Sequence, residues 1–186
     1  MLLVKVPTEP ARYRMAVWRE LRRAGAIALG QGTWAVPDLP AAVQRLFDRL
    51  SELVASTGGS LLVLAAAGHT SADAAHLEQL YAAGREAEWT EFVADCGKYL
   101  AELDHEERIG KLTLAELEEE EQSLDRLRRW YRELRSRDLL GLPVSTDAAG
   151  TLKECEARFD HYAEQVYAAL GQADHVCPAA NAEGGT

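Results

Sequence analysis

The order of hydrophobic patterns in the first 71 residues constrains the fold most strongly. A β-type run at 2–6 is followed by an amphipathic helical pattern over 10–24. Two further β-type runs around a glycine turn at 26–36 predict a hairpin, because short apolar runs joined by glycine favour tight antiparallel pairing. A second amphipathic helix at 38–56 then precedes a buried-type strand at 60–66. The predicted order is strand, helix, strand, strand, helix, strand.

This order predicts an α+β fold with a ferredoxin-like β-α-β-β-α-β sandwich, in which both helices cover one face of an antiparallel sheet. We assign this domain to residues 1–71. From about residue 72 every hydrophobic pattern is helical, which predicts a helical domain of three to four helices over 72–170. Residues 171–186 are small and polar without periodicity, and we expect them to form a disordered tail.

Within the helical part, Gly84 is expected to break or kink the first helix, and Thr113 with Glu116 has the form of a capping box. The helix that follows has apolar residues at alternating three- and four-residue steps, apart from one gap at Glu120-Glu121. These residues are Leu117, Leu124, Leu127, Tyr131 and Leu134. Such a seam suits either antiparallel packing within the chain or a partner helix from a dimer.

Charge is distributed unevenly along the 186 residues. The net charge is −10, yet residues 1–71 carry +3 and the remainder carries −13. The overall charge opposes nonspecific nucleic-acid binding, whereas the first 71 residues do not. The sequence has no recognisable signal or membrane-spanning segment, which predicts a cytoplasmic protein without a membrane partner. The three widely spaced cysteines are expected to be reduced thiols.

The first helix carries the most suggestive polar surface, because guanidinium groups bind phosphates, carboxylates and other oxyanions through forked donors. We predict an anion- or DNA-binding face formed by five arginines: Arg12, Arg14, Arg19, Arg22 and Arg23. The alternative is a solvated face, or one that pairs with acidic helices from the second half.

Catalytic signatures are missing from the sequence. It contains no G-x-S-x-G elbow, no phosphate-binding G-x-x-x-x-G-K loop and no H-E-x-x-H pair. We therefore assign no catalytic residue, predict no cofactor and favour a protein that is not an enzyme. A metal site assembled across helices from Glu and His residues stays open, although no H-x-x-x-H spacing supports it.

Several motifs resemble the N-terminal domain of the chromate-resistance regulator family (ChrB-type), over roughly residues 1–170. In the first part they are Val6-Pro7-Thr8-Glu9, Arg14, Val17-Trp18-Arg19, Leu21, Gly25-Ala26, Leu29, Gly32 and Pro37. In the second part they are Glu88-Trp89-Thr90-Glu91-Phe92, Cys96, Gly110-Lys111-Leu112-Thr113, Glu116-Leu117-Glu118-Glu119, Trp130 and Arg137-Asp138. The first part is also similar to the ferredoxin-like domain of PaaX-type repressors.

The resemblance implies a cytoplasmic regulatory protein of chromate resistance that forms a homo-oligomer such as a dimer, binds promoter DNA and responds to chromate or another oxyanion. The five arginines would supply the contacts, with Trp18 in the core beneath them. Two alternatives remain. One is a noncatalytic protein that assembles with a helical partner through its second half, and the other is a Glu/His metal-dependent oxidoreductase.

Overall fold

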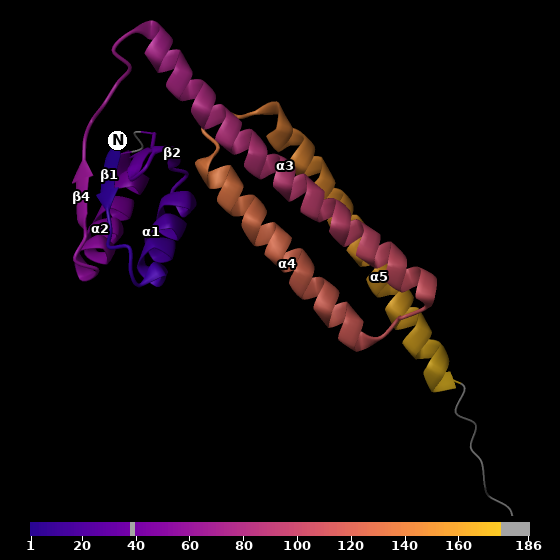
Figure 1. Ribbon diagram of the computed structural model, residues 1–186. Coiled ribbons are helices and arrows are strands. Elements are labelled where there is room, and N and C mark those ends of the chain that lie inside the picture. Colours follow the sequence, from indigo (N-terminus) through magenta and orange to yellow (C-terminus); the bar gives the residue numbers. More distant parts are fainter. Residues whose placement is uncertain (38–39, 176–186) are drawn as a thin grey trace, which may run out of the picture. The chain divides into compact units, whose positions relative to one another are not determined.

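The structure, a computed structural model, describes residues 1–37 and 40–175 and confirms the predicted α+β class (Figure 1). The described elements, in chain order, are β1 (Leu2–Lys5), α1 (Ala11–Arg23), β2 (Ile27–Gly30), β3 (Thr33–Ala35), α2 (Pro40–Ser56), β4 (Ser60–Val63), α3 (Ser71–Ile109), α4 (Leu114–Arg137) and α5 (Pro143–His175). The predicted order of the first six elements is confirmed.

The four strands form one antiparallel sheet in the order β2-β3-β1-β4. Residue Leu2 of β1 is opposite Trp34 of β3 and Val63 of β4, so β1 lies inside the sheet while β2 and β4 form its edges. The β2–β3 pair is the predicted hairpin. Its turn needs a glycine at Gly32, because φ is +73° there and a Cβ atom would lie 2.6 Å from the carbonyl oxygen of Val4.

The core of the sheet lies on the face that α1 and α2 cover, and Figure 1 shows these two helices side by side. Its fully buried residues are Leu2, Val17, Leu21, Ala26, Leu50 and Val54. Alternation along β1 sends Leu2 and Val4 into this core and leaves Leu3 on the opposite face, 37% exposed. The helices therefore cover only one side of the sheet.

Helix α1 ends as its sequence predicts. Gly25 has φ +74°, its N–H donates to the carbonyl of Arg22 at 2.9 Å, and the N–H of Ala26 donates to the carbonyl of Leu21 at 3.0 Å. These two bonds form a Schellman motif, which satisfies carbonyl groups that the helix leaves unpaired. The motif fixes the point where the chain leaves α1, next to the arginine Arg22.

The described chain divides into two compact units. The first, called here the sheet unit, comprises Met1–Glu88 together with Glu133–Leu142. The second, the helical unit, comprises Trp89–Arg132 and the described residues from Pro143 onward. Helices α3 and α4 each contribute residues to both units.

Helix α3 begins at a complete capping box. The Thr70 hydroxyl accepts from the Asp73 N–H at 3.1 Å, and an Asp73 carboxylate oxygen accepts from the Thr70 N–H at 2.9 Å. The expectation that Gly84 breaks the helix is wrong, because α3 continues from Ser71 to Ile109. Gly84 instead faces β2, where an added Cβ would lie 3.4 Å from Ile27. This is an ordinary van der Waals distance, so the helix tolerates a glycine here although the strand does not require one.

Helix α4 uses only one half of its predicted capping box. The Thr113 hydroxyl accepts from the Glu116 N–H at 3.3 Å, but the Glu116 carboxylate forms an ion pair with Lys111 at 2.8 Å.

The leucines of the seam in α4 are all buried within the chain; they are Leu117, Leu124, Leu127 and Leu134. The seam therefore serves packing within the chain and is not open to a partner helix.

Large side chains fill the core of the helical unit. Trp89 and Phe92 are fully buried in α3, and their rings pack against Tyr131 of α4 with centroids 5.5 and 5.8 Å apart. Tyr162 of α5 is also fully buried, and its hydroxyl donates to the carbonyl of Lys111 at 2.8 Å. Helix α5 extends to His175, so it includes the first five residues of the segment 171–186. Residues 176–186 lie outside the described chain.

No described helix combines the length and apolar character that a transmembrane span requires.

Candidate functional site

The five predicted arginines all lie on α1 and are all exposed, but they have different partners. The Arg12 guanidinium lies over the neighbouring Tyr13 ring at 5.1 Å, and Arg23 forms an ion pair with Glu20 at 2.6 Å. Arg14 and Arg19 have no hydrogen bond or ion pair within the described ranges. Only Arg22 reaches a residue distant in sequence, so the five do not form one site.

Arg22 belongs to a charged group within the sheet unit that we call the arginine cluster: Arg22, Arg85, Arg137 and Glu88. The Glu88 carboxylate lies 3.1 Å from Arg22, 3.1 Å from Arg85 and 3.2 Å from Arg137. The side chains of Arg85, Glu88 and Arg137 are only 4%, 7% and 10% exposed, whereas that of Arg22 is 44% exposed. The cluster is therefore buried at Arg85 and open to solvent at Arg22.

Backbone geometry brings these residues together. An added Cβ at Gly25 would lie 3.1 Å from the Arg137 Cβ, so the glycine lets the end of α4 approach the end of α1. An Arg137 Nη1 group donates to the carbonyl of Arg22 at 3.1 Å. The Tyr81 hydroxyl donates to the carbonyl of Arg137, and the Tyr81 ring lies 5.2 Å from the Arg85 guanidinium. Turn geometry, a helix end and an aromatic ring thus hold the cluster.

The charges of the cluster are unequal, with three guanidinium groups around one carboxylate. Arg85 Nε is buried and has no hydrogen-bond partner among the described residues. Burial lowers the pKa of Arg137, and the Arg85 and Arg22 charges lower it further against the opposing effect of Glu88. A second carboxylate nearby, Asp138, accepts from the N–H groups of Leu140 and Gly141. Within the cluster itself, three guanidinium groups against the Glu88 carboxylate leave an excess of positive charge.

Trp18 lies on the open side of this cluster, and its expected place in the core is wrong. Its side chain is 42% exposed, and the Arg22 guanidinium lies 5.1 Å from its ring centroid. The buried face of α1 is formed by Val17 and Leu21, and consecutive helix residues point about 100° apart. Trp18 therefore lies beside the buried stripe, on the surface with Met15.

The other members of the cluster were not among the residues predicted from the sequence. Arg85, Glu88 and Arg137 lie 63 or more residues from Arg22 along the chain, and no local spacing connects them. The only available signal was that Glu88 and Arg137 occur in the stretches that carry the family resemblance. The motifs included Glu88 and Arg137 but not Arg85, and they gave no sign that these residues contact Arg22.

Metal and thiol chemistry have little support in the described residues. No group of three His, Cys, Asp or Glu side chains there is placed to hold a metal ion. Cys96 and Cys155 are fully buried free thiols, and the Cys155 Sγ lies 3.8 Å from the Cys96 carbonyl oxygen. The neighbouring Cys155 thiol and burial raise the pKa of Cys96, which disfavours the reactive thiolate. Cys177 lies outside the described residues.

Comparison with protein families identifies the class of this protein. Residues 14–173 match the family described as "Protein ChrB, N-terminal". The chain belongs to this family, which points to a chromate-resistance-related protein. Neither the curated proteins nor the solved structures contain a match to the chain.

Proposed function

We propose that this chain is a cytoplasmic regulatory protein of chromate resistance whose sheet unit senses an oxyanion through the arginine cluster. The observation that carries the proposal is the excess of guanidinium groups around Glu88, with the buried Arg85 Nε left without a hydrogen-bond partner in the described chain. A tetrahedral dianion such as chromate presents four oxygens to such donors. Buried cations favour a compensating anion, because an unpaired charge in a low-dielectric interior is costly.

Access supports the proposal as well. Arg22 is partly exposed and Trp18 lies next to it, so an anion can meet Arg22 first and then the deeper guanidinium groups. The remaining predicted arginines, Arg12, Arg14, Arg19 and Arg23, would raise the local positive potential without touching the ligand.

Isothermal titration calorimetry with chromate, and with sulfate as a tetrahedral analogue, tests this proposal. We expect saturable chromate binding that weakens at least tenfold in Arg22→Ala and changes less than twofold in Arg19→Ala. Both residues are exposed on α1, so both variants should fold, and Arg19 is a matched control because it lies outside the cluster. Equal weakening in the two variants would show that only general surface charge is involved and would contradict the proposal.

Promoter DNA is the second ligand that we propose, for the exposed face of α1. A cleft of about 320 Å³ is lined there by Ala11, Arg14, Met15 and Trp18. An exposed tryptophan beside an arginine without an ion pair in the described ranges is typical of surfaces that contact phosphates and bases. Fluorescence anisotropy with the chain's own upstream DNA, with and without chromate, tests this role. Binding that disappears at moderate salt and ignores sequence would contradict it.

Two finer assignments accompany these proposals. The strand order β2-β3-β1-β4 with antiparallel pairing supports a ferredoxin-like arrangement of the sheet unit. We also propose that the chain forms a homo-oligomer, through a surface other than the leucine seam. Sedimentation at micromolar concentration tests this, and a monomer would contradict it.

A further inference from the structure

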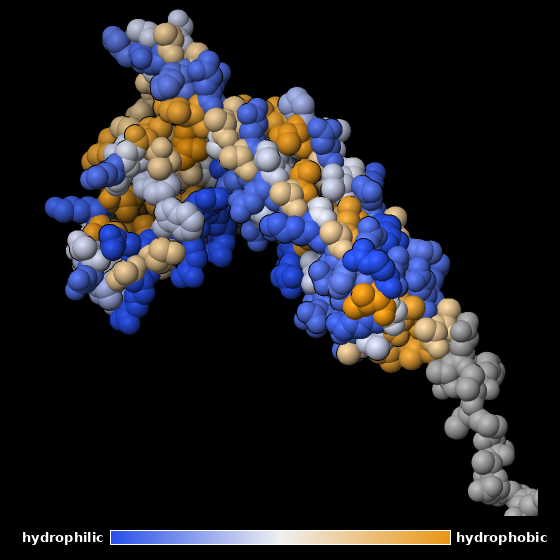
Figure 2. Space-filling view, turned by 45° about the vertical axis from the view of Figure 1, so that its right-hand side comes forward, coloured by the Kyte–Doolittle hydropathy of each residue, from blue (hydrophilic) through white to orange (hydrophobic). Residues whose placement is uncertain are grey.

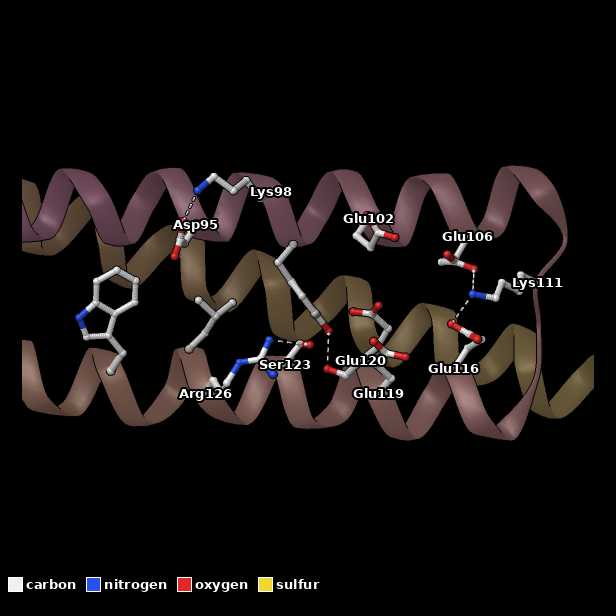
Figure 3. A pocket seen from close by; sticks show the side chains of 13 residues that line it. Asp95, Lys98, Glu102, Glu106, Lys111, Glu116, Glu119, Glu120, Ser123 and Arg126 are labelled. Carbon is white, nitrogen blue, oxygen red and sulfur yellow. Dashed lines mark hydrogen bonds and ion pairs between the residues drawn. The ribbon is translucent and has the colours of Figure 1, made fainter.

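A groove between α3 and α4 in the helical unit carries an inference independent of the proposed function (Figure 3). It has a volume of about 650 Å³, which is in the usual range for small-molecule sites. Most of the charged residues that line it are acidic. The acidic ones include five glutamates, which are Glu102 and Glu106 of α3 and Glu116, Glu119 and Glu120 of α4, and Lys111 lies between the two helices. We call this groove the acidic groove.

Glu120 is the unusual member of this wall. Its side chain lies in the seam of α4, three residues after Leu117, and it is only 6% exposed. Within the described ranges its carboxylate has no hydrogen bond and no ion pair, since the Tyr99 hydroxyl that points at this residue donates to its backbone carbonyl instead. Figure 3 shows Glu120 and Glu119 in the space between the two helices. The Glu120 side chain is therefore largely withdrawn from solvent without a counter-charge, and a cation at its carboxylate would offset that cost.

One primary ammonium group already occupies the end of the groove. Lys111 Nζ lies 2.8 Å from a Glu116 oxygen and 3.6 Å from a Glu106 oxygen. The wall therefore presents carboxylates at spacings that suit ammonium groups. Within the described chain, Glu102, Glu119 and Glu120 are left without such a partner.

The rest of the wall favours an organic cation over a metal ion. No described group of three acidic, His or Cys side chains can hold one metal ion. Tyr99, Leu127 and Trp130 provide apolar surface along the same groove. Of the other cations on the wall, Lys98 is neutralised by Asp95 at 2.6 Å, and Arg126 donates to Ser123 at 3.1 Å.

We propose that the acidic groove binds a small aliphatic polyamine, with ammonium groups on Glu102, Glu119 and Glu120 and methylene segments against the apolar wall. An ammonium group supplies three donors, and an aliphatic chain between such groups matches carboxylates separated by apolar surface. The ligand would thus complete the ion pairing of the only seam position in α4 that is acidic and buried in the described chain.

The state of Glu120 predicts how this binding depends on pH. Burial, followed by the neighbouring charges of Glu102, Glu119, Glu106 and Glu116, raises the pKa of Glu120 to about 7. Lys111 and, from α5, Tyr162 face the same region. Below pH 7 Glu120 must lose a proton before it pairs with an ammonium group, so polyamine affinity should fall between pH 8 and pH 6.

Isothermal titration calorimetry with spermidine on the whole chain at pH 8 tests the proposal. We expect one site whose dissociation constant rises at least tenfold in Glu120→Gln and also rises in Glu102→Gln, which is exposed and therefore should fold. Glu118→Gln is the matched control, since Glu118 is an exposed α4 residue outside the groove, and its dissociation constant should stay within twofold of the wild-type value.

Three results would overturn the proposal. The first is no binding below millimolar spermidine. The second is equal weakening in Glu118→Gln and Glu120→Gln, which would indicate diffuse attraction to an acidic surface. The third is displacement of spermidine by equimolar Mg²⁺, which would identify a site for small hard cations. The chromate experiment uses variants of the sheet unit, whereas the spermidine experiment uses variants of the helical unit. Failure of spermidine binding would therefore leave the test of oxyanion binding unaffected.

Discussion

Replacement of Glu88 by glutamine tests the arginine cluster most directly. Glutamine keeps the size of the side chain and removes the carboxylate that pairs with all three guanidinium groups. Arg85 and Arg137 then remain as buried cations without the carboxylate that pairs with both of them, and the loss of one partner from a buried ion pair costs about 3–5 kcal/mol. We place Glu88→Gln in that range, because two of the three arginines are almost completely buried.

The same variant should respond more strongly to an oxyanion. With Glu88 neutral, a bound sulfate or chromate takes over the role of the carboxylate and restores part of the lost stability. At a concentration 100 times its dissociation constant, a ligand that binds only the folded state adds about 2.7 kcal/mol. We therefore expect millimolar sulfate to stabilise Glu88→Gln more than it stabilises the wild-type chain.

Urea unfolding provides the measurement, followed by circular dichroism and by tryptophan fluorescence, to which Trp18 and Trp34 of the sheet unit contribute. Glu78→Gln is the control, because Glu78 is exposed on the same helix and has no partner in the described ranges. A loss below about 1 kcal/mol in Glu88→Gln, or sulfate effects equal to those in Glu78→Gln, would refute the reasoning that the cluster holds uncompensated charge.

Three further predictions concern separate features. Gly25→Ala should lower the free energy of unfolding in urea by at least about 1–2 kcal/mol, because φ is +74° and the new Cβ would lie 3.1 Å from that of Arg137. Gly30→Ala is the control and should lower it less, because an added Cβ there has no neighbour within 4 Å. The pKa of Glu120 is about 7 in the folded chain and 4.5 as the ordinary value of a glutamate. The stability that this difference contributes is fully present at a pH below 4.5, and it is lost as the pH rises through 7. Glu120→Gln should thus be more stable than wild type at pH 8 by up to about 3 kcal/mol, with the difference vanishing near pH 4.5; a constant difference across pH would contradict this. Because Cys96 and Cys155 are fully buried, iodoacetamide should alkylate them only after the chain unfolds, and mass spectrometry can follow this reaction. Rapid alkylation of the native chain would contradict their burial.

Local patterns were sufficient to predict the elements of the sheet unit. The hairpin turn and the end of α1 each need a residue with positive φ, and glycine provides it at Gly32 and Gly25. Each of these features depends on residues within a few positions of one another. The same local reasoning was wrong at Gly84, because α3 continues through this position despite the low helix propensity of glycine.

The candidate site could not be predicted in this way, because it depends on contacts between distant segments. Arg22 was predicted as a ligand-binding residue, but Glu88 and Arg137, which determine its partners, lie 66 and 115 positions away. Glu120 is an intermediate case. Its position as a gap in the leucine seam was visible in the sequence, and the gap marks the buried carboxylate of the acidic groove.

The uncovered side of the sheet has a consequence for handling the protein. Strand β4 lies at an edge, and its Leu62 and Val63, with the following Leu64, are 52%, 40% and 37% exposed; Figure 2 shows apolar surface on the sheet unit. The segment 60–64 contains no charge and no proline, so its unpaired edge can template intermolecular β-pairing. Aggregation should therefore compete with refolding in the variants that destabilise the sheet unit. Adding Leu62→Lys to such a variant should suppress this aggregation, because a charge on the edge strand opposes pairing between chains.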